Sequence, residues 1–189
     1  MNPTTIFLIR HGRTHENDAR ILQGQLPGRL TDEGIAQGRR LAEKLHDEVF
    51  DAVYASDLQR VRDTLAPLRD QRPDLMVHER TELRERSFGV YQGRPIDAID
   101  WDRVDRREIE TDDAMFDRAT RVVREVLATH PGGRVLIAGH GGINSALTSA
   151  LLHKGRMHRY TFDNCNYSVF EKTVDHPARI LHFNRTDHL

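Results

Sequence analysis

The chain has 189 residues, of which 38% are apolar and 30% are charged, and its formal net charge is -1. This length fits one domain with its own core, and this composition is typical of a globular protein rather than a disordered chain. A charge so close to zero gives no overall attraction to nucleic acid or to a membrane surface, so any anion site must come from a local cluster of positive charge.

Cysteine usage and hydropathy narrow the class further. Cys165 is the only cysteine, which excludes a disulfide within the chain and favours a reducing, cytoplasmic location. We expect this thiol to be a small, buried or half-buried packing residue. No apolar stretch approaches the roughly 20 residues of a membrane span, and the opening MNPTTIFLIRHG lacks the basic region and long apolar run of a signal peptide.

Strand-like and helix-like segments alternate along the chain. Short apolar runs with β-branched residues predict buried strands, and apolar residues at helical spacing predict amphipathic helices. The strands are expected at residues 5–9, 52–55, 75–78 and 135–138, and the helices at residues 32–45, 57–65, 113–129 and 142–152. This alternation predicts a three-layer α/β/α sandwich with a mostly parallel sheet. Two further strand-like runs around VDHPA predict a closing hairpin and an antiparallel edge strand.

Local signals set several of these boundaries. Thr31 is a suitable N-cap, and Ser56 with Gln59 three residues later has the pattern of a capping box. Pro67 is expected to kink or end the helix that starts there. Residues 1–189 are expected to form a single domain, with a short cap excursion at about 86–112 that is charged and irregular.

Polar residues follow two of the predicted strands at equivalent places. The run IFLI leads into Arg10, His11 and Gly12, and the run VLIA leads into Gly139 and His140, followed by two more glycines. In open α/β sheets, ligands bind beyond the carboxyl ends of the strands. If the two strands are neighbours, the two histidines face each other across one pocket, and the glycines bring bare N–H groups close to an anion.

Six stretches, in chain order from residue 6 to about 170, resemble the motif blocks of the histidine phosphatase superfamily, the phosphoglycerate mutase-like proteins. The R-H-G-x-T-x-x-N block is similar to RHGRTHEN, the S-x-L-x-R-x-x-x-T block to YASDLQRVRDT, and the L-x-E-x-x-F-G-x-x-x-G block to ELRERSFGVYQG. The block of the second histidine is similar to VLIAGHGG. Two more blocks resemble ILQGQLPGRLTDEGIAQG and DNCNYSV.

The resemblance implies a role for each matching residue. His11 would be the nucleophile, in its neutral form and with a backbone acceptor on its other ring nitrogen, and Glu85 would protonate the leaving oxygen. Guanidinium groups match the geometry of phosphate oxygens, and phosphoryl transfer depends mainly on positioning and charge. The remaining implied groups are Arg10, Arg60 and His140 on the transferring phosphoryl, Gly12, Asn17 and Gly141 on its oxygens, and Gln23 and Gly24 at the entrance.

Other interpretations of these residues stay open. Glu85 lies between Arg84 and Arg86 and could form a surface ion pair, and Arg60 could be an exposed helix residue paired with Asp57 or Asp63. The arginines between residues 94 and 107 could grip a second anionic group or belong to a solvated face. Tyr91 could contact substrate or pack. His15 lies four residues from His11, a spacing that can bind metal, but no third ligand is evident and the family uses no metal.

The family divides by the acceptor of the phosphoryl group. Members that transfer the phosphoryl group to water are phosphatases. Members that transfer it to a hydroxyl of a bound glycerate are mutases, which are primed by 2,3-bisphosphoglycerate. The excursion between Gly93 and Glu110 is short, and the second histidine block ends in GHGG, as in the phosphatase branch. The sequence therefore predicts a metal-independent, cofactor-free hydrolase of a small phosphorylated metabolite. The mutase is the alternative, and a non-catalytic phospho-ligand-binding module is a weaker one. An edge strand could pair two copies into a homodimer.

Overall fold

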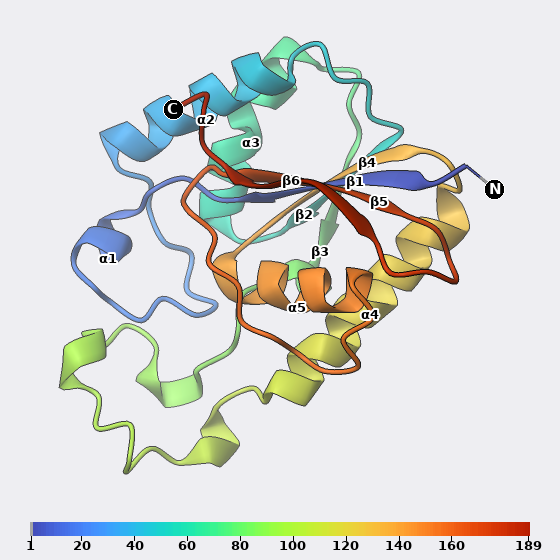
Figure 1. Ribbon diagram of the computed structural model, residues 1–189. Helices are drawn as coiled ribbons and strands as arrows, with labels where there is room; N and C mark the ends of the chain where they lie inside the picture. The colour runs from blue at the N-terminus through green and yellow to red at the C-terminus, as the bar shows by residue number, and fades with distance from the viewer. Residues whose placement is uncertain (1) are drawn as a thin grey trace.

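The computed structural model describes residues 2–189, and its centre is one six-stranded sheet in the order β3-β2-β4-β1-β5-β6 (Figure 1). Its strands are β1 (Thr4–Arg10), β2 (Ala52–Ser56), β3 (Val77–Arg80), β4 (Arg134–Gly139), β5 (Tyr167–Lys172) and β6 (Arg179–Arg185). Its α-helices are α1 (His15–Asp18), α2 (Asp32–Leu45), α3 (Gln59–Gln71), α4 (Asp112–Thr129) and α5 (Gly141–Leu151).

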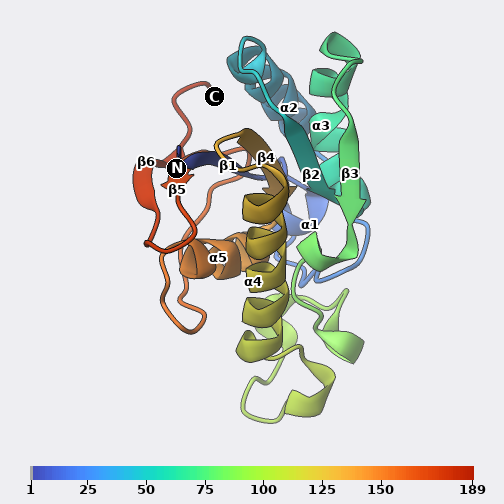
Figure 2. The ribbon, with the colours of Figure 1, turned by 90° about the vertical axis from the view of Figure 1, so that its right-hand side faces the viewer.

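The helices form two layers on opposite faces of the sheet. Helices α2 and α3 pack against one face and α4 and α5 against the other, as the two orthogonal views show (Figures 1 and 2). Side chains along each central strand alternate between the layers, so that Ile6 and Leu8 of β1 join the α4–α5 core, while Phe7 and Ile9 join the α2–α3 core. The predicted three-layer sandwich in a single domain is confirmed.

Strand direction also follows the prediction, with one refinement. Strands β3, β2, β4 and β1 pair in parallel, and β5 pairs antiparallel with β1. The strand that runs against the others is thus β5, one place in from the edge, because β6 pairs beyond it as the second arm of the closing hairpin. None of the helices in residues 2–189 combines the length and apolar character that a membrane span requires.

Two expected helix boundaries were wrong. Helix α3 continues past Pro67 to Gln71, since Leu68 on its buried face packs into the core and holds the last turn. Its N-cap is Leu58, which has no side-chain cap bond, so the capping box expected of Ser56 does not form. Strand β3 is also two residues later than expected, because Val77 pairs in register with Val53 of β2.

The cap excursion contains no strand in its described residues and consists of short 3-10 turns joined by loops. It lies below and to the left of the sheet in Figure 1. Backbone hydrogen bonds tie it to the loop before α2: Leu22 N–H donates to Arg94 O at 2.9 Å, and Gly93 N–H donates to Leu22 O at 2.8 Å. The Tyr91 hydroxyl accepts from the N–H of Asp105, so this side chain packs within the cap.

Candidate active site

The parallel pairing of β1 and β4 brings the two predicted histidines together. Arg10 is in register with Gly139 at the carboxyl ends of the two strands, and His11 and His140 follow at the same edge of the sheet. Their rings lie 5.1 Å apart between centroids, with 58° between their planes. The expected pair of facing histidines is therefore confirmed.

His11 is held in one tautomer as a neutral ring. Its Nδ1 lies 2.7 Å from the carbonyl oxygen of Gly12, and because a carbonyl only accepts, Nδ1 carries the proton and Nε2 keeps a lone pair. Burial, followed by the charges of Arg60 and Arg10, holds the pKa of His11 well below its usual value. The structure thus supplies the neutral ring and the backbone acceptor that an attacking nitrogen needs.

Gly12 positions this histidine instead of binding an anion with its amide, which corrects one prediction. Its N–H donates to Thr64 Oγ1 at 2.9 Å, so this donor is already used. A Cβ at Gly12 would lie 2.6 Å from the carbonyl oxygen of Gly34, so only glycine fits where the turn touches helix α2. Thr64 in turn donates to Arg60 O. Apart from its place in the S-x-L-x-R-x-x-x-T block, nothing in the sequence indicated that Thr64 supports the site.

His140 is fully buried, and protein groups occupy both of its ring nitrogens. Arg60 Nε donates to Nδ1 at 3.1 Å, so Nε2 carries the proton and donates to Ser56 Oγ at 2.9 Å. Burial and the charge of Arg60 hold the pKa of His140 well below its usual value. In this state His140 is a neutral ring whose single N–H is used by Ser56, so it is neither the third positive group nor the donor to the phosphoryl that the resemblance implied. Ser56 is a partner that the sequence analysis missed.

Arg60 is 1% exposed, so the interpretation as a surface residue was wrong. Besides His140, its guanidinium donates to the carbonyl oxygens of Gly24 at 2.8 Å, Leu26 and Pro27. Burial lowers the pKa of this guanidinium to about 10, and it remains a cation at neutral pH. Four of its five N–H donors hold His140 and the loop around Gly24, and one Nη2 proton remains toward the cavity.

Arg10 has spare donors at the start of helix α5. Its Nη1 donates to Phe162 O at 2.6 Å, but its Nε is buried and has no partner among the described residues. The Nε atom lies 3.8 Å from the point where a Cβ at Gly141 would be. Gly141 and Gly142 are the first residues of α5, whose leading N–H groups have no acceptor within the helix. An anion placed here would meet both the orphaned guanidinium N–H and a helix N-terminus.

Glu85 faces the same place, and its neighbours form other ion pairs. Its Oε2 accepts from Gly142 N–H at 3.0 Å, and its Oε1 accepts from Arg86 N–H at 2.8 Å. A Cβ at Gly142 would lie 2.2 Å from Oε1, so the second glycine of GHGG makes room for this carboxyl. Arg84 pairs with Asp57 and Arg86 with Asp112, so the surface ion pair proposed for Glu85 does not form.

A buried arginine that the sequence analysis did not single out holds the backbone of this segment. Arg118 of α4 is 8% exposed and donates to the carbonyl oxygens of Glu82, Arg84 and Glu85, and to the carboxylate of Glu110. The signal that could have found it is a charge on the apolar face of the predicted helix, one turn before Val122. Gln25 Nε2 donates to Glu85 O at 3.1 Å from the opposite side.

The three remaining predicted residues, Asn17, Gln23 and Gly24, also line the cavity. The Oδ1 of Asn17 accepts from the N–H of Thr14, which leaves the amide nitrogen of Asn17 unused by that bond. Gln23 donates from Nε2 to Thr14 Oγ1 at 2.8 Å, and its buried Oε1 meets no donor in the described part of the chain. Gly24 has φ +52°, and a Cβ there would collide with Gln92 Oε1, so a glycine is required.

These groups line one cavity of about 570 Å³. Eight of the ten predicted site residues line it, namely Arg10, His11, Asn17, Gln23, Gly24, Arg60, Glu85 and Gly141, whereas Gly12 and His140 do not. The buried thiol of Cys165 does not line it either. Burial raises the pKa of Cys165 to about 12, in agreement with the packing role expected for it.

The fold and the site define an α/β protein with a cavity around a neutral histidine at the carboxyl ends of its strands. The model of the histidine phosphatase superfamily (branch 1) matches residues 6–186, and the chain belongs to this family. It is 33% identical over 172 residues to the glucosyl-3-phosphoglycerate phosphatase of Mycobacterium tuberculosis, over 80% of this chain and 77% of that protein. It is 31% identical over 164 residues to the metal-independent phosphoserine phosphatase of Arabidopsis thaliana, over 76% of this chain and 67% of that protein.

A solved structure agrees with these relatives. The mycobacterial glucosyl-3-phosphoglycerate phosphatase, solved in complex with VO3, superposes with a TM-score of 0.84 at 26% sequence identity. The superposition covers 96% of this chain and 99% of that one. The family expected from the motif blocks is therefore confirmed.

Proposed function

We propose that this protein is a metal-independent phosphomonoester hydrolase that works through a phosphohistidine on His11. The observation that carries the proposal is a neutral His11, with its Nε2 lone pair free, in one cavity with an unpartnered arginine N–H and a carboxyl group. The relatives that are named as phosphatases support the same reaction class.

In the first step, His11 Nε2 attacks phosphorus and the bond from phosphorus to the ester oxygen breaks. The proton stays on Nδ1, hydrogen-bonded to the Gly12 carbonyl, and Arg10 and the start of α5 neutralise the oxygens of the transferring group. Glu85 acts as the general acid and gives a proton to the leaving alkoxide.

In the second step, water attacks the phosphohistidine and gives a proton to the Glu85 carboxylate, and inorganic phosphate leaves with His11 neutral again. Arg60 contributes a permanent charge below the phosphoryl group and fixes the loop around Gly24, and it has one further N–H for the phosphate. His140 orders Arg60 through the bond to its Nδ1.

The test is phosphate release from a panel of phosphorylated metabolites in EDTA, with wild type and His11→Ala side by side. We expect release that needs His11 and survives the chelator, and an acid-labile phosphate on His11 after rapid quenching. Strict metal dependence, or release that persists in His11→Ala, would overturn the mechanism. The panel includes 3-phosphoglycerate with 2,3-bisphosphoglycerate, and isomerisation without release would assign the chain to the mutases.

A further inference from the structure

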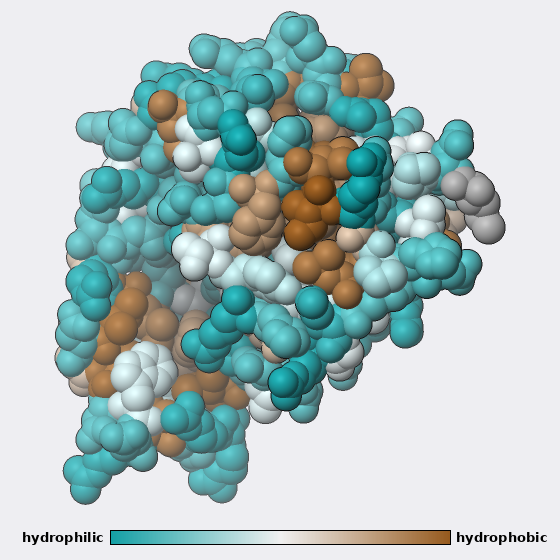
Figure 3. All heavy atoms as spheres, viewed as in Figure 1, coloured by the Kyte–Doolittle hydropathy of each residue, from teal (hydrophilic) through white to brown (hydrophobic). Residues whose placement is uncertain are grey.

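The cavity extends well beyond the groups that would hold a phosphoryl. Its outer half is lined by apolar and aromatic side chains from three segments: Ile21 and Leu22 before α2, Phe88, Ile96, Trp101 and Ile109 in the cap, and Met157 and Tyr160 after α5. Figure 3 shows apolar side chains gathered around a hollow at the lower left, where the cap lies. A phosphoryl group fills only a small part of about 570 Å³, and a volume of this size suits a much larger ligand.

Contacts within the protein hold Phe88 and Trp101, the aromatic wall of the cavity, in place. The rings of Phe88 and Trp101 meet edge to face, 6.4 Å apart between centroids and 70° between planes. Arg106 Nη2 donates to the carbonyl oxygen of Trp101 at 3.0 Å. The N–H of Ile96 donates to Arg20 O at 2.8 Å, which ties this turn of the cap to the segment opposite. The two aromatic side chains are therefore held in place before any ligand arrives.

The charged side chains that line the cavity are basic, apart from one carboxyl. Among the described residues, Glu85 is the only acidic side chain that lines the cavity, and its carboxyl lies at the inner end against α5. Three arginines, Arg86, Arg106 and Arg159, also line the cavity, and of these Arg86 pairs with Asp112 and Arg106 donates to the carbonyl oxygen of Trp101. Beside these guanidinium groups the lining offers apolar surface and no further carboxylate. If the substrate were the ester of a compact polar alcohol, this apolar surface would stay exposed to water. An alcohol with an apolar ring would remove it from water.

From these observations we propose that the outer half binds the alcohol part of the substrate through a ring-sized apolar face. The preferred substrates are then phosphate esters of aromatic or ring-containing apolar alcohols, and Trp101 and Phe88 determine specificity. This inference rests on the proposed phosphatase function of the same cavity and adds the class of leaving group.

The kinetic test compares two esters that differ by one fused ring, phenyl phosphate and 2-naphthyl phosphate, whose leaving groups are of similar acidity. We expect kcat/KM for the naphthyl ester to exceed that for the phenyl ester by about tenfold, the scale of one well-filled apolar subsite. The Trp101→Ala variant should reduce this ratio to about one, and Trp101→Phe should restore most of it. Val90→Ala is the matched control, since Val90 lies in the same cap but is 59% exposed and does not line the cavity.

A binding test is independent of turnover. Trp101 is the only tryptophan in the chain, so intrinsic tryptophan fluorescence reports on this wall directly. Titration of the wild-type protein with benzylphosphonate should change the emission, whereas methylphosphonate, which has the same charge and no ring, should change it far less.

Equal kcat/KM values for the two esters in the wild-type protein, or a ratio that persists in Trp101→Ala, would overturn the proposal. An equal fluorescence response to the two phosphonates would overturn it as well. Failure of the parent function is distinguishable, because then neither ester would release phosphate in a His11-dependent way.

Discussion

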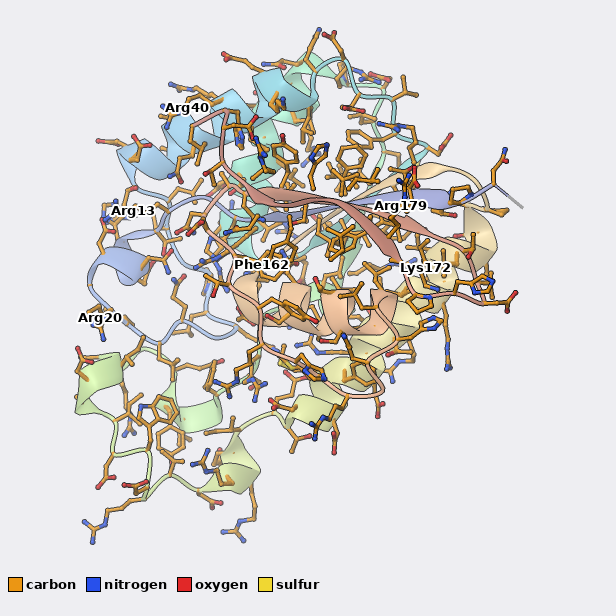
Figure 4. All side chains as sticks on the ribbon, in the orientation of Figure 1. Arg13, Arg20, Arg40, Phe162, Lys172 and Arg179 are labelled. Carbon is orange, nitrogen blue, oxygen red and sulfur yellow. The ribbon has the colours of Figure 1, made fainter. Side chains whose placement is uncertain are left out.

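Both ends of the central sheet bury a positive charge, and the two charges are satisfied in different ways. At the end near Phe162, the buried Nε of Arg10 has no hydrogen-bond partner within residues 2–189. At the other end, Lys172 is 2% exposed, and its ammonium contacts His153 Nε2 at 2.9 Å, Val174 O at 3.2 Å and the carbonyl oxygens of Thr173 and His176. Figure 4 labels Phe162 and Lys172 toward these two ends.

The difference separates a ligand site from a structural site. The Lys172 ammonium has three donors and four acceptors around it, so nothing is left for a ligand, and it closes the turn between β5 and β6. Arg10 keeps a donor free in a cavity, at a cost in desolvation that an incoming anion would relieve. Burial of a cation alone does not indicate function, and neither does a buried N–H without a partner, since the Nε atoms of Arg40 and Arg80 are also of this kind. The Arg10 donor indicates function because Arg10 lines the cavity of the site.

The largest expected effect is at the nucleophile. His11→Ala should reduce kcat by at least about 10⁴-fold, because no other group at this position carries a free lone pair. The midpoint of thermal unfolding should stay within a few degrees of wild type. A midpoint much lower than that would mean that His11 also supports the fold, and the comparison with Lys172 would lose its meaning.

Arg10→Met should reduce kcat/KM by about 10³-fold, since it removes a preorganised donor and a charge beside the phosphoryl group. It should also raise the pKa of His11, because the Arg10 charge is one of the causes that lower it. The His11 ring signals in NMR should then titrate at higher pH than in wild type. An unchanged titration would show that the charge of Arg10 does not influence the pKa of His11.

Lys172→Met should lower the stability of the fold and leave kcat unchanged, which is the opposite of the result expected for Arg10→Met. Three carbonyl groups would lose their donor, and we expect the free energy of unfolding to fall by about 3 kcal/mol. Chemical denaturation measures this loss, and kcat at a temperature where the variant is folded should match that of wild type. A large loss of kcat in the folded variant would contradict the division between the two ends of the sheet.

Glu85→Gln should separate two classes of substrate. An alkyl phosphate, whose leaving oxygen needs a proton, should react about 10²-fold more slowly, in line with the loss of a general acid. Turnover of p-nitrophenyl phosphate, whose leaving group scarcely needs a proton, should change by less than about fivefold. Equal losses on both substrates would exclude Glu85 as the general acid.

Arg118→Lys tests the support behind this carboxyl. Lysine keeps the charge but cannot span the carbonyls of residues 82, 84 and 85 together with Glu110. We expect a loss of about tenfold on the alkyl phosphate and a smaller loss on p-nitrophenyl phosphate, the same signature as Glu85→Gln in weaker form. A uniform loss on both substrates would indicate a structural role only.

The strand ends could be predicted because their signals are local. The apolar runs before Arg10 and Gly139, and the glycines after the two histidines, depend on neighbouring residues alone, and the sheet, the helix layers and the inner site followed from them. The helix that runs past Pro67 shows the limit of such signals, since the packing of Leu68 outweighed the local rule.

The sequence by itself determined the α/β fold, the family and the position of the two histidines, because hydrophobic period and motif spacing are properties of contiguous chain. Only the tertiary structure decided which donors are already used: Arg60 on His140, which lies 80 positions away, Gly12 on Thr64, and Arg118 behind Glu85. These bonds join residues from different layers, and their geometry is set by how the helices pack on the sheet. For that reason the free donor on Arg10 and the aromatic wall of the cap became visible only in the folded molecule.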